Sequence, residues 1–230
     1  MSARVATNEK SKSFFGLFGL GGFAREVMPL VFERHLASIA SSPIPYDTVA
    51  FVEKDPTSSF ANGIAVMREE DFLAVENSKY FNVAIADSRI RERLVAKCEA
   101  SSAKPVSIFS GRSVIYESAT IGEGAVVCAN AVISANTAVG RHFHLNFGSY
   151  VAHDCIVGDF VTFAPAVQCC GNVIIGDHVF VGVGALIHPG TPDRPLRIGS
   201  GAVIGMGAVV IDDVDPGATV VGNPARPIHR

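Results

Sequence analysis

Charged side chains are scarce in this chain of 230 residues, and neither sign dominates. Asp, Glu, Lys and Arg make up 18% of the sequence, below the ~25% that is usual for globular proteins, and the net charge is −3. Because the net charge is small and negative, the composition argues against nucleic acid or an anionic membrane surface as a partner. Apolar residues make up 48%, and so few charges suit a chain that hides part of its surface in an oligomer.

Long apolar runs are absent as well. No stretch reaches the eighteen consecutive apolar residues of a transmembrane helix. The first residues lack an apolar core followed by a small-residue cleavage site, so no signal peptide is expected. The five cysteines show no disulfide-framework spacing, which predicts free thiols in a reducing compartment. The expected location is the cytoplasm.

What the chain does contain is a strict six-residue repeat between residues 115 and 187. The apolar positions are Ile115, Ile121, Val127, Ile133, Val139, Leu145, Val151, Val157, Phe163, Cys169, Ile175, Val181 and Ile187. Glycines follow every third of them, 18 residues apart, at Gly122, Gly140, Gly158 and Gly176. A six-residue repeat nested in an 18-residue repeat fits no helical period. It predicts a parallel β-helix with three short strands in each coil.

In such a solenoid, successive coils stack at the ~4.8 Å strand spacing and the repeated apolar residue points inward. Cys169 occupies an inward position, so it is expected to pack rather than to react. A β-sandwich with regular turns is the alternative fold, which thirteen in-phase positions disfavour. The repeat breaks at residues 188–195 and resumes at Ile198. This interruption predicts a loop, and loops inserted in solenoids often lie on the working face.

Residues 13–110 show strands and helices in alternation, which predicts a small Rossmann-like parallel sheet with helices on its faces. The expected strands are 14–18, 48–52, 64–67, 81–86 and 105–109. The expected helices are one that carries Val27, Leu30, Val31 and Leu36 at helical spacing, then 68–75, then 88–100 with Asp87 or Ser88 as N-cap. The chain is thus expected to form an α/β domain of residues 13–110 and a β-helix domain of residues 111–230.

A glycine-rich turn links the first expected strand and helix. Its residues, Gly19-Leu20-Gly21-Gly22, let backbone N–H groups approach a phosphate at a helix N-terminus, although the full G-x-G-x-x-G pattern is not present. The turn is therefore either a ligand cradle or a plain tight turn. Ligands of parallel sheets bind at the carboxyl ends of the strands. One crevice is expected to contain Gly21, Gly22, Glu53, Lys54 and Asp87.

The run Gly-Leu-Gly-Gly-Phe-Ala-Arg-Glu from residue 19, followed by a hexapeptide solenoid, resembles the bacterial sugar-nucleotide acetyltransferases of the PglD and NeuD kind. That family acts in surface polysaccharide biosynthesis. The resemblance covers nearly the whole chain. It implies a left-handed β-helix, a homotrimer with active sites between subunits, acetyl-CoA as co-substrate and no metal.

The resemblance also implies that the N-terminal domain holds a nucleotide-linked amino sugar. Gly21, Gly22 and Phe23 would line the sugar-nucleotide site. Glu53 and Lys54 stand where some relatives have acidic residues near the nucleoside. Because Lys54 departs from that pattern, the base could belong to a UDP-, GDP- or dTDP-sugar.

Within the repeat, His153 stands directly before a carboxylate, Asp154. It follows an inward position by two residues, which predicts a corner of the coil. The residues alone allow either a surface histidine or a general base. The resemblance implies that His153 is the base and that Asp154 raises its basicity. Neighbours on a regular strand point to opposite faces, so the pair can interact only if the backbone bends there.

The remaining site positions come from the resemblance too. Gly171 matches the glycine whose backbone N–H holds the thioester oxygen, and Asn146 matches a polar position near the acceptor. Thr162 stands where some relatives carry a second histidine that contacts the acetyl donor. The final Gly-Asn-Pro-Ala-Arg run resembles the end of many hexapeptide acyltransferases. Coenzyme A is expected at Thr162, Gly171, Val183, Met206, Gly207 and Arg226.

The expected reaction is N-acetylation of the amino sugar by direct transfer, without a covalent enzyme intermediate. O-acetylation of a sugar hydroxyl needs the same groups, and a trimeric scaffold that senses a nucleotide is the non-enzymatic alternative. A zinc enzyme is a further alternative, since γ-class carbonic anhydrases build a three-histidine site on a trimeric β-helix. Two of those histidines lie five residues apart, a spacing not found here. His142 and His144 would point the same way from a strand, but no third ligand is evident.

Overall fold

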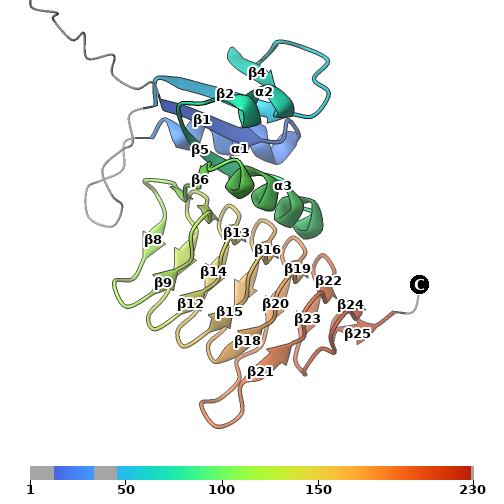
Figure 1. The fold of residues 1–230 in the computed structure, drawn as a ribbon. Helices are drawn as coiled ribbons and strands as arrows, with labels where there is room; N and C mark the ends of the chain where they lie inside the picture. The colour runs from blue at the N-terminus through green and yellow to red at the C-terminus, as the bar shows by residue number, and fades with distance from the viewer. Residues whose placement is uncertain (1–12, 34–45, 229–230) are drawn as a thin grey trace, which may run out of the picture.

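The computed structural model describes residues 13–33 and 46–228, which form a small α/β sheet seated on a long three-faced solenoid (Figure 1). Leu36, which is expected in the first helix, lies outside the described residues. The α/β part lies along one side of the first coils, and helix α3 (Ser88–Ala100) runs next to the solenoid. Within the described part of the chain, no helix is long and apolar enough to cross a membrane.

The N-terminal sheet has six strands in the order β3-β4-β2-β1-β5-β6. All neighbouring strands are parallel except the β3–β4 pair, which is antiparallel. This order sets the carboxyl ends of β2, β1 and β5 side by side. The elements are β1 Ser13–Phe18, α1 Gly22–Val31, β2 Thr48–Glu53, β3 Phe60–Ala61, β4 Ile64–Arg68, α2 Glu69–Ala74, β5 Ser78–Val83 and β6 Lys104–Pro105.

Two expected strands were misplaced. The strand expected at 81–86 is β5, which ends at Val83, because the chain beyond it leaves the sheet and the carbonyls of Ile85 and Ala86 accept hydrogen bonds from Arg91. The strand expected at 105–109 is divided between β6 and β7 (Ile108–Phe109), and β7 pairs with the solenoid. The short strand β3, which only lengthens the edge of the sheet, had no counterpart among the expected strands.

The solenoid has three parallel faces, which confirms the β-helix predicted from the six-residue repeat. The first face contains β7, β10 Val126–Val127, β13 His144–Leu145, β16 Thr162–Phe163, β19 Phe180–Val181, β22 Val203–Ile204, β24 Thr219–Val221 and an antiparallel β25 Arg226–Pro227. The second contains β8 Val114–Ile115, β11 Val132–Ile133, β14 Tyr150–Val151, β17 Gln168–Cys169, β20 Leu186–Ile187 and β23 Val209–Val210. The third contains β9 Thr120–Ile121, β12 Ala138–Val139, β15 Ile156–Val157, β18 Val173–Ile175 and β21 Leu196–Ile198.

Each coil repeats the one before it with a shift of 18 residues. On the first face Leu145 pairs with Phe163, and Phe163 pairs with Val181. These inward side chains are completely buried and form one continuous core along the solenoid axis. At the corners the coils approach so closely that a Cβ on Gly122 would lie 2.6 Å from the carbonyl carbon of Gly140. The expected inward packing of Cys169 is confirmed, since it is also fully buried.

The break in the repeat is a loop of residues 188–195 that projects from the solenoid before β21 (Figure 1). The register resumes when Ile175 pairs with Ile198, as expected. The solenoid itself begins at β7, slightly before the expected domain boundary at residues 110 and 111. Whether residues 13–110 and 111–230 are separate folding domains stays a prediction.

A buried arginine joins the sheet to the solenoid. Arg91 of α3 is fully buried and donates to the carbonyl of Ile85 at 2.7 Å and to that of Phe160 at 2.5 Å. Burial lowers the pKa of Arg91 to about 9. Because Arg91 donates hydrogen bonds to carbonyls of the N-terminal part and of the solenoid, it links the segment after β5 to the first face of the solenoid. No sequence pattern singled out this residue.

Candidate functional site

The histidine–carboxylate pair sits at the corner between the second and third faces, where β14 ends and β15 has not begun. Asp154 has a φ of 57°, and this left-handed conformation supplies the bend that the pair requires. Nδ1 of His153 lies 2.7 Å from Oδ2 of Asp154. Both side chains are open to solvent, with exposed fractions of 56% and 46%. The corner predicted for His153 and its contact with Asp154 are therefore present.

The carboxylate also sets the orientation of the imidazole. Its hydrogen bond with His153 and a second one from the Asn136 side-chain amide, at 3.0 Å, lower the pKa of Asp154. An ionised carboxylate only accepts, so Nδ1 of His153 donates and Nε2 of the neutral ring carries the free lone pair. Asn136 was missed, although it precedes Asp154 by one 18-residue coil and that period could have revealed it.

Gly171 faces the ring one coil further along. A Cβ added there would lie 2.6 Å from Cε1 and 2.7 Å from Nε2 of His153, so only glycine lets the ring stand this close. The backbone N–H of Asn172, next to Gly171, donates to the His153 carbonyl at 3.2 Å. Among the described residues, no acceptor takes the Gly171 N–H. A basic nitrogen and a free donor thus meet at one corner.

The inserted loop begins beside the same corner. Gly190 donates its N–H to the Gly171 carbonyl at 3.0 Å. Further along, the loop and residues 211–213 line a hollow of about 450 Å³ that contains Arg194, Asp212 and Asp213. The loop thus lies next to the predicted oxyanion donor, and its role at the working face stays a prediction.

Other predicted coenzyme positions gather at a different corner, between the first and second faces. Val183 follows β19 and Met206 follows β22 one coil later, with exposed fractions of 40% and 77%. The Gly207 N–H donates to the Val183 carbonyl at 2.9 Å. Asn146 lies at this corner too, where its side-chain amide donates to the Phe163 carbonyl at 2.9 Å. Within one protomer, the second face separates these residues from His153.

Two predicted coenzyme positions lie elsewhere. Thr162 is buried on the first face, where its hydroxyl accepts from Arg91 at 3.1 Å. Arg226 in β25 is exposed and lies 3.8 Å from the Asp212 carboxylate. The structure therefore distributes the predicted coenzyme contacts over several places, and their roles stay predictions.

The predicted substrate residues lie at the carboxyl edge of the N-terminal sheet. Gly21 precedes α1 and Gly22 begins it, and a Cβ on either would meet open space. Glu53 ends β2, and the Lys54 N–H donates to its carboxylate at 3.1 Å. Phe23 turns toward the solenoid, with its ring centroid 5.1 Å from that of His144. The N-terminus of α1 is thus open, and the crevice expected from these residues stays a prediction.

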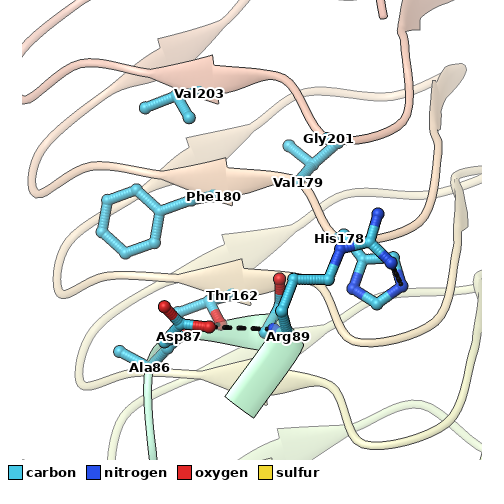
Figure 2. A pocket seen from close by; sticks show the side chains of 10 residues that line it. Ala86, Asp87, Arg89, Thr162, His178, Val179, Phe180, Gly201 and Val203 are labelled. Atoms are coloured by element: carbon cyan, nitrogen blue, oxygen red, sulfur yellow. Dashed lines mark hydrogen bonds between the residues drawn. The ribbon is translucent and has the colours of Figure 1, made fainter. Parts of the chain in front are cut away.

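Asp87 differs from those residues because its carboxylate is already engaged. It is the N-cap of α3, as expected, and accepts from the N–H groups of Arg89 and Ile90 at 3.0 and 2.9 Å. It also lines a cavity of about 480 Å³ between α3 and the first face, which Thr162, His178 and Phe180 line as well. Figure 2 shows Arg89 reaching from α3 to the His178 ring across this cavity.

The two histidines weighed as metal ligands face the N-terminal sheet. His142 lies at a corner with a φ of 54° and His144 lies on β13, so the expectation that both stand on one strand was wrong. The His142 ring stacks on Phe160 at 5.2 Å, and neither ring nitrogen has a hydrogen-bond partner among the residues that the structure describes. Nε2 of His144 lies 3.0 Å from the Val83 carbonyl. Within residues 13–33 and 46–228, no three His, Cys, Asp or Glu residues form a group that could hold a metal.

These buried histidines predict acid sensitivity. Burial, helped by Arg141 and Arg91, lowers the pKa of His142 to about 3, and burial lowers that of His144 well below its ordinary value. Between those values and the unfolded pKa of ~6.5, the unfolded chain binds more protons than the folded one. The free energy of unfolding should therefore fall below pH ~6.5, by about 1.4 kcal/mol per pH unit for each histidine.

Urea unfolding between pH 7 and pH 5 measures this slope. His142→Phe should reduce the slope of the unfolding free energy against pH by the contribution of one proton. Phe is chosen because Phe160 shows that a phenyl ring fits the equivalent corner, where φ is 57°. His188→Ala, at an exposed position, is the matched control and should leave the slope unchanged. An identical slope in His142→Phe and the unaltered protein would refute the assignment.

Known proteins resemble this chain over most of its length. The family model for the hexapeptide repeat of succinyl-transferase matches residues 111–135 and 172–211. The GDP-perosamine N-acetyltransferase of Escherichia coli O157:H7 is 43% identical over 219 residues, which cover 95% of this chain and 97% of that protein. Two solved structures give the same picture of the fold.

WeeI from Acinetobacter baumannii AYE has a TM-score of 0.87 and 41% identity, with 94% of this chain and 100% of that chain covered. PerB from Caulobacter crescentus, solved with CoA and GDP-perosamine, has a TM-score of 0.81 and 28% identity, with 95% and 97% covered. These likenesses confirm the expected architecture, a left-handed β-helix joined to a Rossmann-like sheet.

Proposed function

The chain belongs to the hexapeptide-repeat sugar-nucleotide acetyltransferases, and from that premise we propose that it transfers the acetyl group of acetyl-CoA to the amine of a GDP-linked amino sugar, with His153 as general base. The observation that carries the proposal is the corner where Nε2 of His153 stands against Gly171, whose N–H has no acceptor in the described part of the chain. A GDP sugar is favoured because the relative from Escherichia coli is named for GDP-perosamine and PerB was solved with it.

In the proposed reaction, the amine of the sugar attacks the thioester carbonyl carbon directly. Nε2 of His153 takes the proton that the amine loses, and Asp154 keeps the ring oriented and stabilises the resulting imidazolium. The Gly171 N–H donates to the carbonyl oxygen as negative charge develops on it. The tetrahedral intermediate then collapses and expels the coenzyme A thiolate. No covalent enzyme intermediate is needed.

The acceptor would bind at the carboxyl edge of the N-terminal sheet. Gly21 and Gly22 leave the N-terminus of α1 open, which suits the diphosphate because N–H groups and the helix dipole favour an anion there. Glu53 and Lys54 lie at the end of the neighbouring strand, where a nucleoside would reach. Phe23 and Asp87 are the proposed contacts toward the solenoid, and Asn146 is proposed to approach the sugar.

A homotrimer would complete the site. The second face exposes apolar side chains, among them Val114 at 52% and Leu186 at 45%. Packing that face against a neighbour would bring the corner of Val183 and Met206 toward the corner of His153 in the adjacent protomer. Coenzyme A would lie in this cleft with Gly207, and Thr162 and Arg226 are further proposed contacts of the coenzyme. Exposed apolar contacts of this kind are what an obligate interface buries.

A nucleotide panel tests the proposal. Thermal unfolding in the presence of GDP-, UDP- and dTDP-linked amino sugars should show a stabilisation that is largest for the GDP compound, because a ligand bound only by the folded form raises its stability. Thiol release from acetyl-CoA should then require the same compound. Stabilisation without thiol release would favour the nucleotide-sensing scaffold, and acetylation of a GDP sugar that lacks an amine would favour O-acetylation.

A further inference from the structure

Two buried thiols converge on one backbone carbonyl behind the proposed site. The Cys155 Sγ lies 3.2 Å from the Cys170 oxygen and the Cys169 Sγ lies 3.6 Å from it. Both side chains are fully buried. Its hydrogen bond with Cys155, together with burial, raises the pKa of Cys169 well above its ordinary value, whereas the same hydrogen bond lowers the pKa of Cys155.

The carbonyl of Cys170 belongs to the same peptide unit as the N–H of Gly171. In a trans peptide the C=O and the N–H point in opposite directions. Because the Cys170 carbonyl points toward the buried thiols, the Gly171 N–H points away from the core. The His153 ring stands against the same glycine, where an added Cβ would lie 2.7 Å from its Nε2. The Cys170–Gly171 peptide is therefore oriented with its carbonyl toward the buried thiols and its N–H away from the core.

Cys155 also connects this peptide to the backbone of the base. It follows His153 by two residues, and its Sγ lies 3.7 Å from the His153 carbonyl. The thiol thus lies between the segment that carries the imidazole and the peptide that carries the free N–H. The Cys169 thiol, by contrast, contacts the carbonyl of its own neighbour in the chain and lies farther from it.

We infer that Cys155 is a positioning residue for acetyl transfer, whose S–H holds the Cys170–Gly171 peptide so that its N–H faces the thioester oxygen. The inference rests on the proposed function, in which Gly171 stabilises the oxyanion. Donation to the carbonyl of an amide also polarises its N–H, and this makes the N–H a better donor. A thiol is a weak donor, but a buried and fixed one keeps the peptide from rotating.

Three substitutions separate donation from packing. Cys155→Ser keeps a donor, whereas Cys155→Val fills the volume without one and Cys155→Ala does neither. If the thiol donates, kcat should fall about tenfold in the Ala and Val variants, the size of one hydrogen bond in a rate constant, and stay near the unaltered value in the Ser variant. KM for acetyl-CoA should change little, because the Gly171 contact strengthens only in the transition state.

Cys128→Ala is the matched control. Cys128 is equally buried in the solenoid, and in the described part of the chain its thiol makes no hydrogen bond. This variant should lose stability as Cys155→Ala does while it retains kcat. Thermal unfolding of all variants then separates a loss of fold from a loss of rate.

The order of the kcat values decides the outcome. Ser above Val and Ala supports the positioning role. If the Val variant has at least the kcat of the unaltered protein and the Ser variant is the slowest, Cys155 has a packing role and the inference is overturned. Equal kcat values in all three variants would overturn it as well. If the unaltered protein is active and the Cys155 variants are equally active, the inference fails but the proposed acetyl transfer stands. If the unaltered protein itself shows no acetyl transfer, the proposed function is wrong.

Discussion

Replacing His153 with Ala should lower kcat for acetyl transfer about 10²- to 10⁴-fold, the usual contribution of a positioned general base. The imidazole is the basic group that Asp154 orients and that stands within contact distance of Gly171. The neutral amine of the sugar attacks through its lone pair, and a base must take the proton that the nitrogen loses as the new bond forms. Initial rates of thiol release at saturating acetyl-CoA give the measurement.

The fold should survive this change, because the His153 side chain is more than half exposed. Thermal unfolding and the elution volume of the assembly are expected to match those of the unaltered protein. A His153→Ala variant with an undiminished kcat would remove His153 as the base.

Gly171→Ala should lower kcat by about 10²- to 10³-fold, a loss like that of one oxyanion-hole donor. The new methyl group would lie 2.6 Å from Cε1 of the His153 ring, closer than carbon atoms pack, so the ring or the 170–171 peptide must move. Either movement separates the base from the donor. Stability should change little, since the displaced ring borders solvent.

A double-mutant cycle shows which group moves. If the methyl group acts by displacing the imidazole, Gly171→Ala should cost little more once His153 is already Ala. If it moves the peptide, the second loss should add to the first. Steady-state rates of the unaltered protein, the two single variants and the double variant complete the cycle, and a fully active Gly171→Ala would exclude Gly171 as the donor.

The solenoid could be predicted because its information is local and repeated. One inward apolar residue in six and a glycine at each third corner determine the stacking, as the pairing of Leu145 with Phe163 shows. Helix α3 was predicted with its bounds, since Asp87 caps it through two backbone N–H groups. The end of β5 was not, because it depends on hydrogen bonds from Arg91, a residue whose burial comes from contact with a distant strand.

In the candidate site too, features that follow the repeat could be predicted, and features that depend on local conformation could not. The corner position of His153 follows from the repeat, and Gly171 lies one 18-residue coil beyond it. The contact with Asp154 could not be derived from a regular strand, because it depends on the left-handed φ of Asp154. The arrangement of the Cys155 thiol behind the Gly171 peptide depends on side-chain rotamers in two successive coils, which no sequence period records.

The most direct measurement is the identity of the product formed from acetyl-CoA and GDP-perosamine, by mass spectrometry and by NMR of the sugar. The account predicts one acetyl group on the sugar amine for each thiol released, formed by the unaltered protein and nearly absent with His153→Ala. Thiol release without an acetylated sugar, an acetyl group on a hydroxyl, or equal product from the His153→Ala variant would contradict it.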